Sequence, residues 1–133
     1  MIDTHRPVDP TVNPLTHLAF IEIARELRQA PAYETSGKSS RALTRSADLS
    51  MVLLAMREGA ELKEHHAPGP ATAIVLEGEI LFSSATVEGG KLDTETVISA
   101  HECAVFSPLL QHAVRARTET LMLVVIGGKT PAE

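Results

Sequence analysis

The chain has 133 residues, which is enough for one domain with a buried core, and 44% of them are hydrophobic although only 3% are aromatic. Lys and Arg number 12 against 17 Asp and Glu, so the net charge is −5, and no basic block typical of nucleic-acid binding occurs. The single cysteine excludes an intramolecular disulfide, and no apolar run is long enough to span a membrane. With no secretory signal pattern at the start, we expect a cytoplasmic protein that contacts neither nucleic acid nor a membrane.

The N-terminal part, residues 1–40, is predicted to be an arm followed by one helix. Residues 1–12 carry two prolines among polar side chains, which is typical of a loose arm. Asn13 and Pro14 are a favourable N-cap and first-turn pair, so we expect the helix to run from Leu15 to about Gln29. Its apolar side chains recur at helical spacing at Phe20, Ile23, Ala24 and Leu27.

Strands are expected from residue 41 onward, after a polar loop over residues 32–40. The run from Leu49 to Met56 is apolar at both alternating positions, which predicts a strand that is covered on both sides. One side would face the interior of a barrel, and the other would need a sheet or a second subunit against it. We therefore expect a homodimer.

Two apolar runs surround a tight corner in the middle of the chain. Ala71–Leu76 follows a Pro-Gly-Pro turn and is rich in β-branched residues, which predicts a buried strand. Glu77 and Gly78 form the corner before a second run, Glu79–Ser83. Strands joined so tightly are expected to lie antiparallel.

The remaining chain alternates short apolar runs with turn residues. Gly89 and Gly90 predict a hairpin turn with positive φ at both positions. Cys103 has apolar neighbours and is expected to be a small buried residue. Further strands are predicted at 92–98, 104–106, 113–116 and 121–126. Short strands at such regular intervals indicate an all-β barrel or sandwich.

The central stretch resembles the first signature motif of the cupin superfamily, G-x5-H-x-H-x3,4-E-x6-G. Gly59 matches the first glycine, His65 the first histidine and Gly78 the last glycine. Ala67 occupies the position of the second histidine and Ala71 that of the glutamate, so two of the three metal ligands of this motif are missing.

A second segment, Ser107–His112, is similar to the P-x-G-x-x-H core of the other cupin motif and places His112 at its histidine. The resemblance covers roughly residues 40–126 and is closest to short bacterial cupins. It implies a small antiparallel β-barrel, the jelly-roll-like cupin or double-stranded β-helix fold, over residues 41–126. Residues 127–133 would then be a C-terminal tail.

The resemblance also implies a site inside the barrel. His65 is expected to point inward, with His112 meeting it across the cavity from a distant strand. His66 is expected to point outward or along the rim, because adjacent side chains of a regular strand face opposite ways. No bulge can be predicted from the sequence. A third metal ligand could come only from Glu64, His101 or Glu102.

Two classes of function follow. The first is a barrel that binds a small molecule, with His65, His112 and His66 as ligand-binding residues. The second is a metal-dependent enzyme of the isomerase or dioxygenase type, with His65 and His112 holding a divalent ion such as Zn, Fe, Mn or Ni. A metal-free sugar epimerase ranks last, because no Tyr or Asp stands where an acid partner is needed and Tyr33 lies in the arm.

Overall fold

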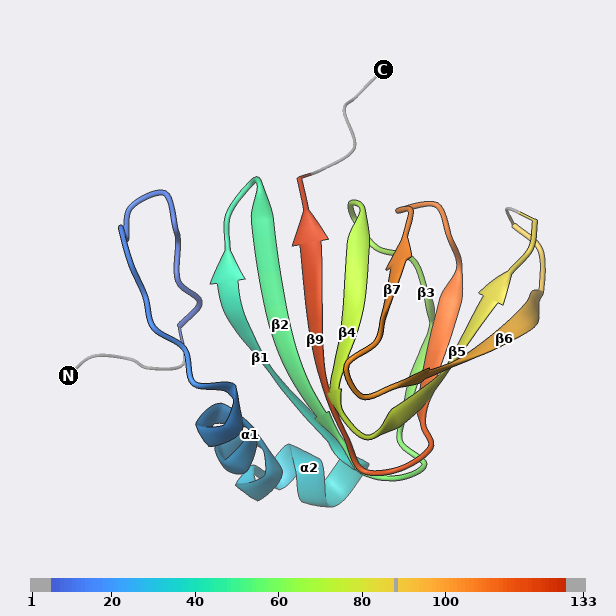
Figure 1. Ribbon diagram of the computed structural model, residues 1–133, viewed down its shortest axis with the longest axis horizontal. Helices are drawn as coiled ribbons and strands as arrows, with labels where there is room; N and C mark the ends of the chain where they lie inside the picture. Colours follow the sequence, from blue (N-terminus) through green and yellow to red (C-terminus); the bar gives the residue numbers. More distant parts are fainter. Residues whose placement is uncertain (1–5, 88, 129–133) are drawn as a thin grey trace.

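The computed structural model describes residues 6–87 and 89–128, which form two antiparallel β-sheets that face each other (Figure 1). The five-stranded sheet has the order β1-β2-β9-β4-β7, and the four-stranded sheet has the order β3-β8-β5-β6. The elements are α1 (Phe20–Gln29), α2 (Pro31–Ser36), β1 (Lys38–Arg45), β2 (Leu49–Met56), β3 (Glu61–His65), β4 (Ala71–Glu77), β5 (Glu79–Ala85), β6 (Leu92–Ser99), β7 (Cys103–Phe106), β8 (His112–Ala116) and β9 (Thr120–Gly127). The predicted all-β antiparallel barrel is confirmed.

The main core lies between the two sheets, because each strand turns alternate side chains inward. In β8, for example, His112, Val114 and Ala116 are buried, whereas Arg115 between them is exposed. The other buried members of this core are Leu54, Met56, Ala73, Val75, Ile80, Phe82, Ile98 and Met122. Aliphatic side chains therefore fill most of the interior, as the low aromatic content requires.

Helix α1 begins at Phe20, so the predicted start at Leu15 is wrong. Asn13 ends a turn instead, in which its backbone N–H donates to the Asp9 carbonyl at 3.0 Å. Leu15 is 90% exposed and would gain no contact from a helical turn. The helix begins where its apolar stripe begins, because tertiary packing contributes more to a short helix than a favourable cap does.

A second short helix and the first strand replace the loop predicted over residues 32–40. Pro31 ends α1 and is also the first residue of α2, a position that needs no N–H donor. Tyr33 of α2 is buried rather than part of a loose arm. Gly37 ends α2 with φ at +79°, and β1 starts at the next residue.

The helices cover the outer side of the five-stranded sheet at β1 and β2 (Figure 1). Ala24 and Leu27 of α1 pack in a second core with Leu53, Ala55 and Leu121 on that side. The apolar pattern of β2 correctly predicts burial on both faces, but the chain's own helix covers the outer one. Within the described residues, no helix is long and apolar enough to cross a membrane.

The corner at Gly78 carries the chain from one sheet to the other. Strand β4 pairs with β7 and β9, whereas β5 pairs with β6 and β8, so the predicted pairing of the two runs is wrong. Gly78 has φ at +86°, and an added Cβ would lie 2.2 Å from the Glu119 carbonyl oxygen. At the predicted hairpin between β5 and β6, Gly89 has positive φ but Gly90 does not.

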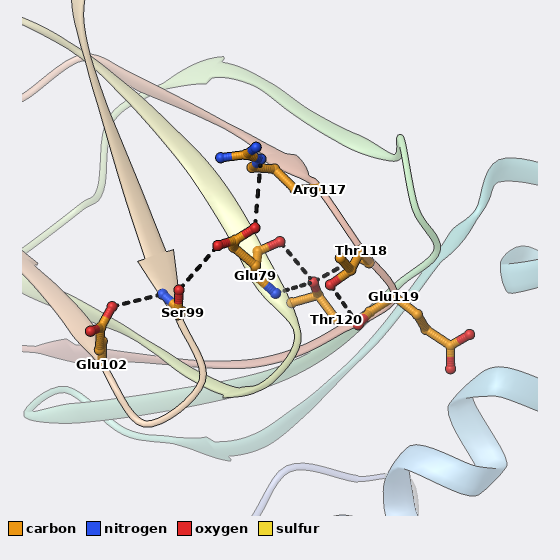
Figure 2. Close-up of polar contacts among 7 residues, drawn as sticks. All are labelled: Glu79, Ser99, Glu102, Arg117, Thr118, Glu119 and Thr120. Carbon is orange, nitrogen blue, oxygen red and sulfur yellow. Dashed lines mark hydrogen bonds and ion pairs between the residues drawn. The ribbon is translucent and has the colours of Figure 1, made fainter.

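A polar network ties the strands together beside this corner (Figure 2). The Glu79 carboxylate accepts a hydrogen bond from the Ser99 hydroxyl at 3.2 Å and lies 3.6 Å from the Arg117 guanidinium. Thr120 is fully buried, accepts from the Glu79 N–H at 3.3 Å and donates to the Thr118 carbonyl at 2.8 Å. These contacts lie at the start of β5, whereas His112 stands opposite Ser84 near the other end of that strand.

Candidate functional site

His112 is the buried centre of the site, with 3% of its surface exposed. It is the first residue of β8 and faces the interior with Val114. Its ring stacks on Phe82 of β5, with ring centroids 5.2 Å apart and planes 7° apart. Phe106 of β7 contacts the same ring from the other sheet, at a centroid distance of 4.5 Å. His112 is thus fixed among aromatic rings at the end of the barrel.

His65 lies beside His112 on the neighbouring strand, and the two ring centroids are 4.2 Å apart. The predicted contact between the rings is present, but it does not cross the cavity. In the antiparallel pair of β3 and β8, His65 stands directly opposite His112, so both rings belong to one wall.

A bulge in β3 brings His65 to this position. Leu62 pairs with Val114, but the next pair is His65 with His112, so three steps along β3 match two along β8. In a regular strand Glu64 would stand opposite His112. The extra residue reverses the alternation, so His65 rather than Glu64 lies beside His112. His65 lines the cavity but is itself exposed, so it is not turned fully inward as predicted.

His66 also lines the cavity, although its side chain is largely exposed. Strand β3 ends at His65, so the rule that adjacent residues of a strand face opposite ways does not apply to His66. Its Nδ1 lies 3.3 Å from Gln111 Nε2, a contact that links the loop after β3 to the loop before β8. His66 therefore lies on the rim, which is one of the two positions predicted for it.

These side chains surround an interior cavity of about 110 Å³. Ala67 and Ala71, which replace two ligands of the cupin motif, are buried and lie in its wall. The short side chains leave open the space beside the histidines. The other lining residues are Leu62, Pro68, Ala73, Phe82, Phe106, Val114, Met122, Val124 and Ile126.

The electrostatics of the cavity favour a neutral His112. Burial lowers the pKa of His112 below its usual value, and the proximity of His65 and His66 adds to that effect. A hydrogen bond with the Leu110 carbonyl acts in the opposite direction and is the weaker influence. The neutral form of His112 therefore predominates at neutral pH, so one ring nitrogen donates a hydrogen bond and the other accepts one.

The described residues do not provide a three-donor metal site. No group of three or more His, Cys, Asp and Glu side chains in the described ranges is placed to hold an ion. Of the predicted third ligands, Glu64 is exposed. His101 and Glu102 lie in the β6–β7 turn, where the Glu102 carboxylate accepts from the Ser99 N–H at 2.8 Å (Figure 2). Two imidazoles alone do not match the ligand sets usual for divalent ions.

Sequence reasoning missed the residues that surround the two imidazoles. Phe82 and Phe106 are two of only three phenylalanines in the chain, which is the one signal that could have singled them out. Gln111 precedes His112, and nothing in the sequence marked it as a residue of the site. Cys103, predicted to be buried, is exposed because it lies on the outward side of the edge strand β7.

No family model and no curated protein matches the chain. Solved structures do match it. A cupin 2 conserved barrel domain protein from Leptotrichia buccalis is 29% identical with a TM-score of 0.61, over 71% of this chain and 43% of that one. An RmlC-like cupin from Desulfovibrio desulfuricans is 24% identical with a TM-score of 0.62, over 74% and 90% of the two chains.

A variant of oxalate decarboxylase from Bacillus subtilis is 18% identical with a TM-score of 0.63, over 73% of this chain and 27% of that one. Identities this low carry the fold and leave the activity open. The two facing antiparallel sheets and these likenesses agree with the motif at Gly59–Gly78. The protein described here has the cupin fold.

Proposed function

We propose that this protein binds a small molecule in the cavity between its two sheets, with His112 and His65 as the polar groups that orient it. The observation that carries the proposal is the wall of that cavity, which is apolar except for three histidines. An apolar pocket with a few converging polar groups is the usual composition of a ligand site. His66 would contact the ligand at the rim.

The size of the cavity limits the ligand. A volume of about 110 Å³ is well below the roughly 300–1,000 Å³ of pockets for drug-sized molecules. The ligand, or the part of it that enters the barrel, is therefore a group of few atoms.

A metal-dependent enzyme of the isomerase or dioxygenase type is the second candidate. Its support is that the Nδ1 atoms of both rings contact backbone carbonyls, because a histidine that binds a metal through one ring nitrogen commonly donates from the other to such a carbonyl. If an ion were bound, His65 and His112 would hold it, and it would polarise a substrate oxygen. The shortage of a third donor among the described residues ranks this candidate second.

Elemental analysis separates the two candidates. Protein purified without added metal, and again after soaking in Zn²⁺ or Mn²⁺, is expected to hold much less than one ion per chain. About one ion per chain, lost in the His65→Ala variant but kept in His17→Ala, would favour the enzyme and contradict the proposal.

Methionine methyl NMR tests the binding itself. The chain has four methionines, of which Met122 lines the cavity and Met51 packs on the other side of the five-stranded sheet. A set of small apolar compounds with one polar group is expected to move the Met122 signal and leave that of Met51 in place. In an Ala73→Leu variant, which fills the cavity, the response should disappear.

A further inference from the structure

The two imidazoles of the cavity share one feature beyond their contact. His65 Nδ1 lies 2.6 Å from the Lys63 carbonyl oxygen, and His112 Nδ1 lies 3.0 Å from the Leu110 carbonyl oxygen. A carbonyl oxygen only accepts hydrogen bonds, so both Nδ1 atoms carry the hydrogen. In a neutral ring the other nitrogen, Nε2, then holds a lone pair and can only accept.

Neither Nε2 atom has a hydrogen-bond partner in the part of the chain that the structure describes. The described residues that line the cavity include no Asp, Glu, Lys or Arg. A ligand in the cavity therefore meets apolar groups and the lone pairs of neutral imidazole rings, and no carboxylate, ammonium or guanidinium group of the described residues.

The rim offers the complementary group. Gln111 Nε2 is a donor, so His66 Nδ1 accepts from it at 3.3 Å, and the hydrogen of a neutral His66 is on Nε2. The His112 acceptor thus belongs to the buried part of the lining, the His65 acceptor belongs to its exposed part, and a donor lies at the mouth.

We infer that the cavity takes a small neutral molecule that donates a hydrogen bond from a hydroxyl or N–H group to His112 Nε2 or His65 Nε2. This inference rests on the proposed function and specifies its ligand class. The apolar body of the molecule packs against Phe82 and Phe106, and any acceptor it carries faces His66. Carboxylates and phosphates are disfavoured, because they would meet two lone pairs in an apolar cavity.

The volume sets the size of this molecule. An apolar cavity of about 150 Å³ holds benzene, so a pocket of about 110 Å³ that is open at its mouth suits a compact alcohol, or a single ring that projects partly from the mouth. Phenol and toluene are suitable probes, because they have the same shape and differ only in a hydroxyl replacing a methyl group.

Titration of the full chain with phenol, toluene and benzoate, followed by the Met122 methyl signal, tests the inference. Phenol should bind up to about tenfold more tightly than toluene, the effect of one net hydrogen bond, and benzoate should bind most weakly. In His112→Phe, which keeps a ring against Phe82, the preference for phenol should shrink, whereas His17→Phe should keep it.

A second measurement does not depend on a variant that folds. Imidazole ¹⁵N NMR of the free wild-type protein should show both rings protonated at Nδ1, and phenol should shift an Nε2 signal. Equal binding of phenol and toluene, or rings protonated at Nε2, would overturn the inference and leave the proposed function standing. If no compound moves the Met122 signal, the proposed function falls with it.

Discussion

The proposed ligand site depends on one buried imidazole, that of His112. His112 is 3% exposed and lies among His65, Phe82 and Phe106, which gives it a fixed position and a lowered pKa. A buried histidine that stays neutral is useful for recognising an uncharged ligand, because it adds a directed hydrogen bond without bringing a charge into the core.

The lowered pKa of His112 predicts a pH dependence of stability. An unfolded histidine has a pKa near about 6.5, so the unfolded chain binds more protons than the folded one between that value and the lower folded pKa. The free energy of unfolding should therefore fall as the pH is lowered through this range. In His112→Gln this part of the decline should be absent.

Urea denaturation at about pH 7.5 and pH 5.5 measures the effect. The matched control is His17→Gln, which removes an exposed histidine and should keep the decline of the wild type. If His112→Gln and the wild type lose the same stability between the two pH values, His112 is not the group responsible.

At the scale of elements, the bulge in β3 decides which side chain faces the cavity. The sequence identifies His65 through its place in the motif, but regular alternation from Leu62 would turn Glu64 inward. A bulge depends on the fit between two strands that are distant in sequence, and single-strand patterns hold no information on it. For the same reason His65 and His112 could be predicted to meet, but not to share a wall.

The helices also show that local sequence patterns do not predict features that depend on tertiary packing. The apolar stripe of α1 was predictable because its spacing is local, whereas its start was not, because Leu15 finds no surface to pack against. Helix α2 was not predicted, because its sequence is mostly polar; burial of Tyr33 holds it in place. The apolar strands were the most predictable elements, since apolar runs bounded by turn residues mark them directly, whereas the polar strands β1 and β3 contain no such run.

The corner between β4 and β5 yields a second prediction. Gly78→Ala should be destabilised by a strained positive φ and by a clash with the Glu119 carbonyl, since that oxygen lies 2.2 Å from the new Cβ. Gly59→Ala is the matched control, because Gly59 has nearly the same φ, +87°, but nothing within 4 Å of an added Cβ.

Denaturation curves of both variants separate the two effects. Gly59→Ala introduces backbone strain alone, whereas Gly78→Ala adds the clash with the Glu119 carbonyl. Gly59→Ala should cost about 1–3 kcal/mol, the usual cost of a strained backbone residue, and Gly78→Ala clearly more. Equal losses would show that the chain relaxes at the corner and that the close approach of Gly78 to the β8–β9 loop is not required.

For the whole molecule, the homodimer expected from the sequence stays a prediction, and a smaller apolar surface now supports it. Helix α1 already covers part of the outer face of the five-stranded sheet. Beyond the helix, Met51, Ile74 and Val125 are only partly buried, and Val105 of β7 is 79% exposed. We propose that a second copy of the chain covers this remaining apolar area, which is continuous with the second core.

Sedimentation analysis tests this interface. The wild type should be a dimer at micromolar concentration, and Val105→Lys should shift it to a monomer, because the lysine would bury a charge in an apolar contact. Val97→Lys, on the four-stranded sheet and 42% exposed, should leave the dimer intact. A monomeric wild type, or a Val105→Lys variant that still dimerises, would contradict the proposed interface.

The proposed function requires that His65 and His112 form one wall of a cavity that receives a small molecule without a metal ion. A crystal structure of protein purified without added metal tests it most directly. The two rings should lie side by side, with centroids near the 4.2 Å found here and no ion within coordination distance, about 2.0–2.1 Å, of either Nε2. Either ring on the outer surface of the barrel, or an ion bound to both Nε2 atoms, would contradict it.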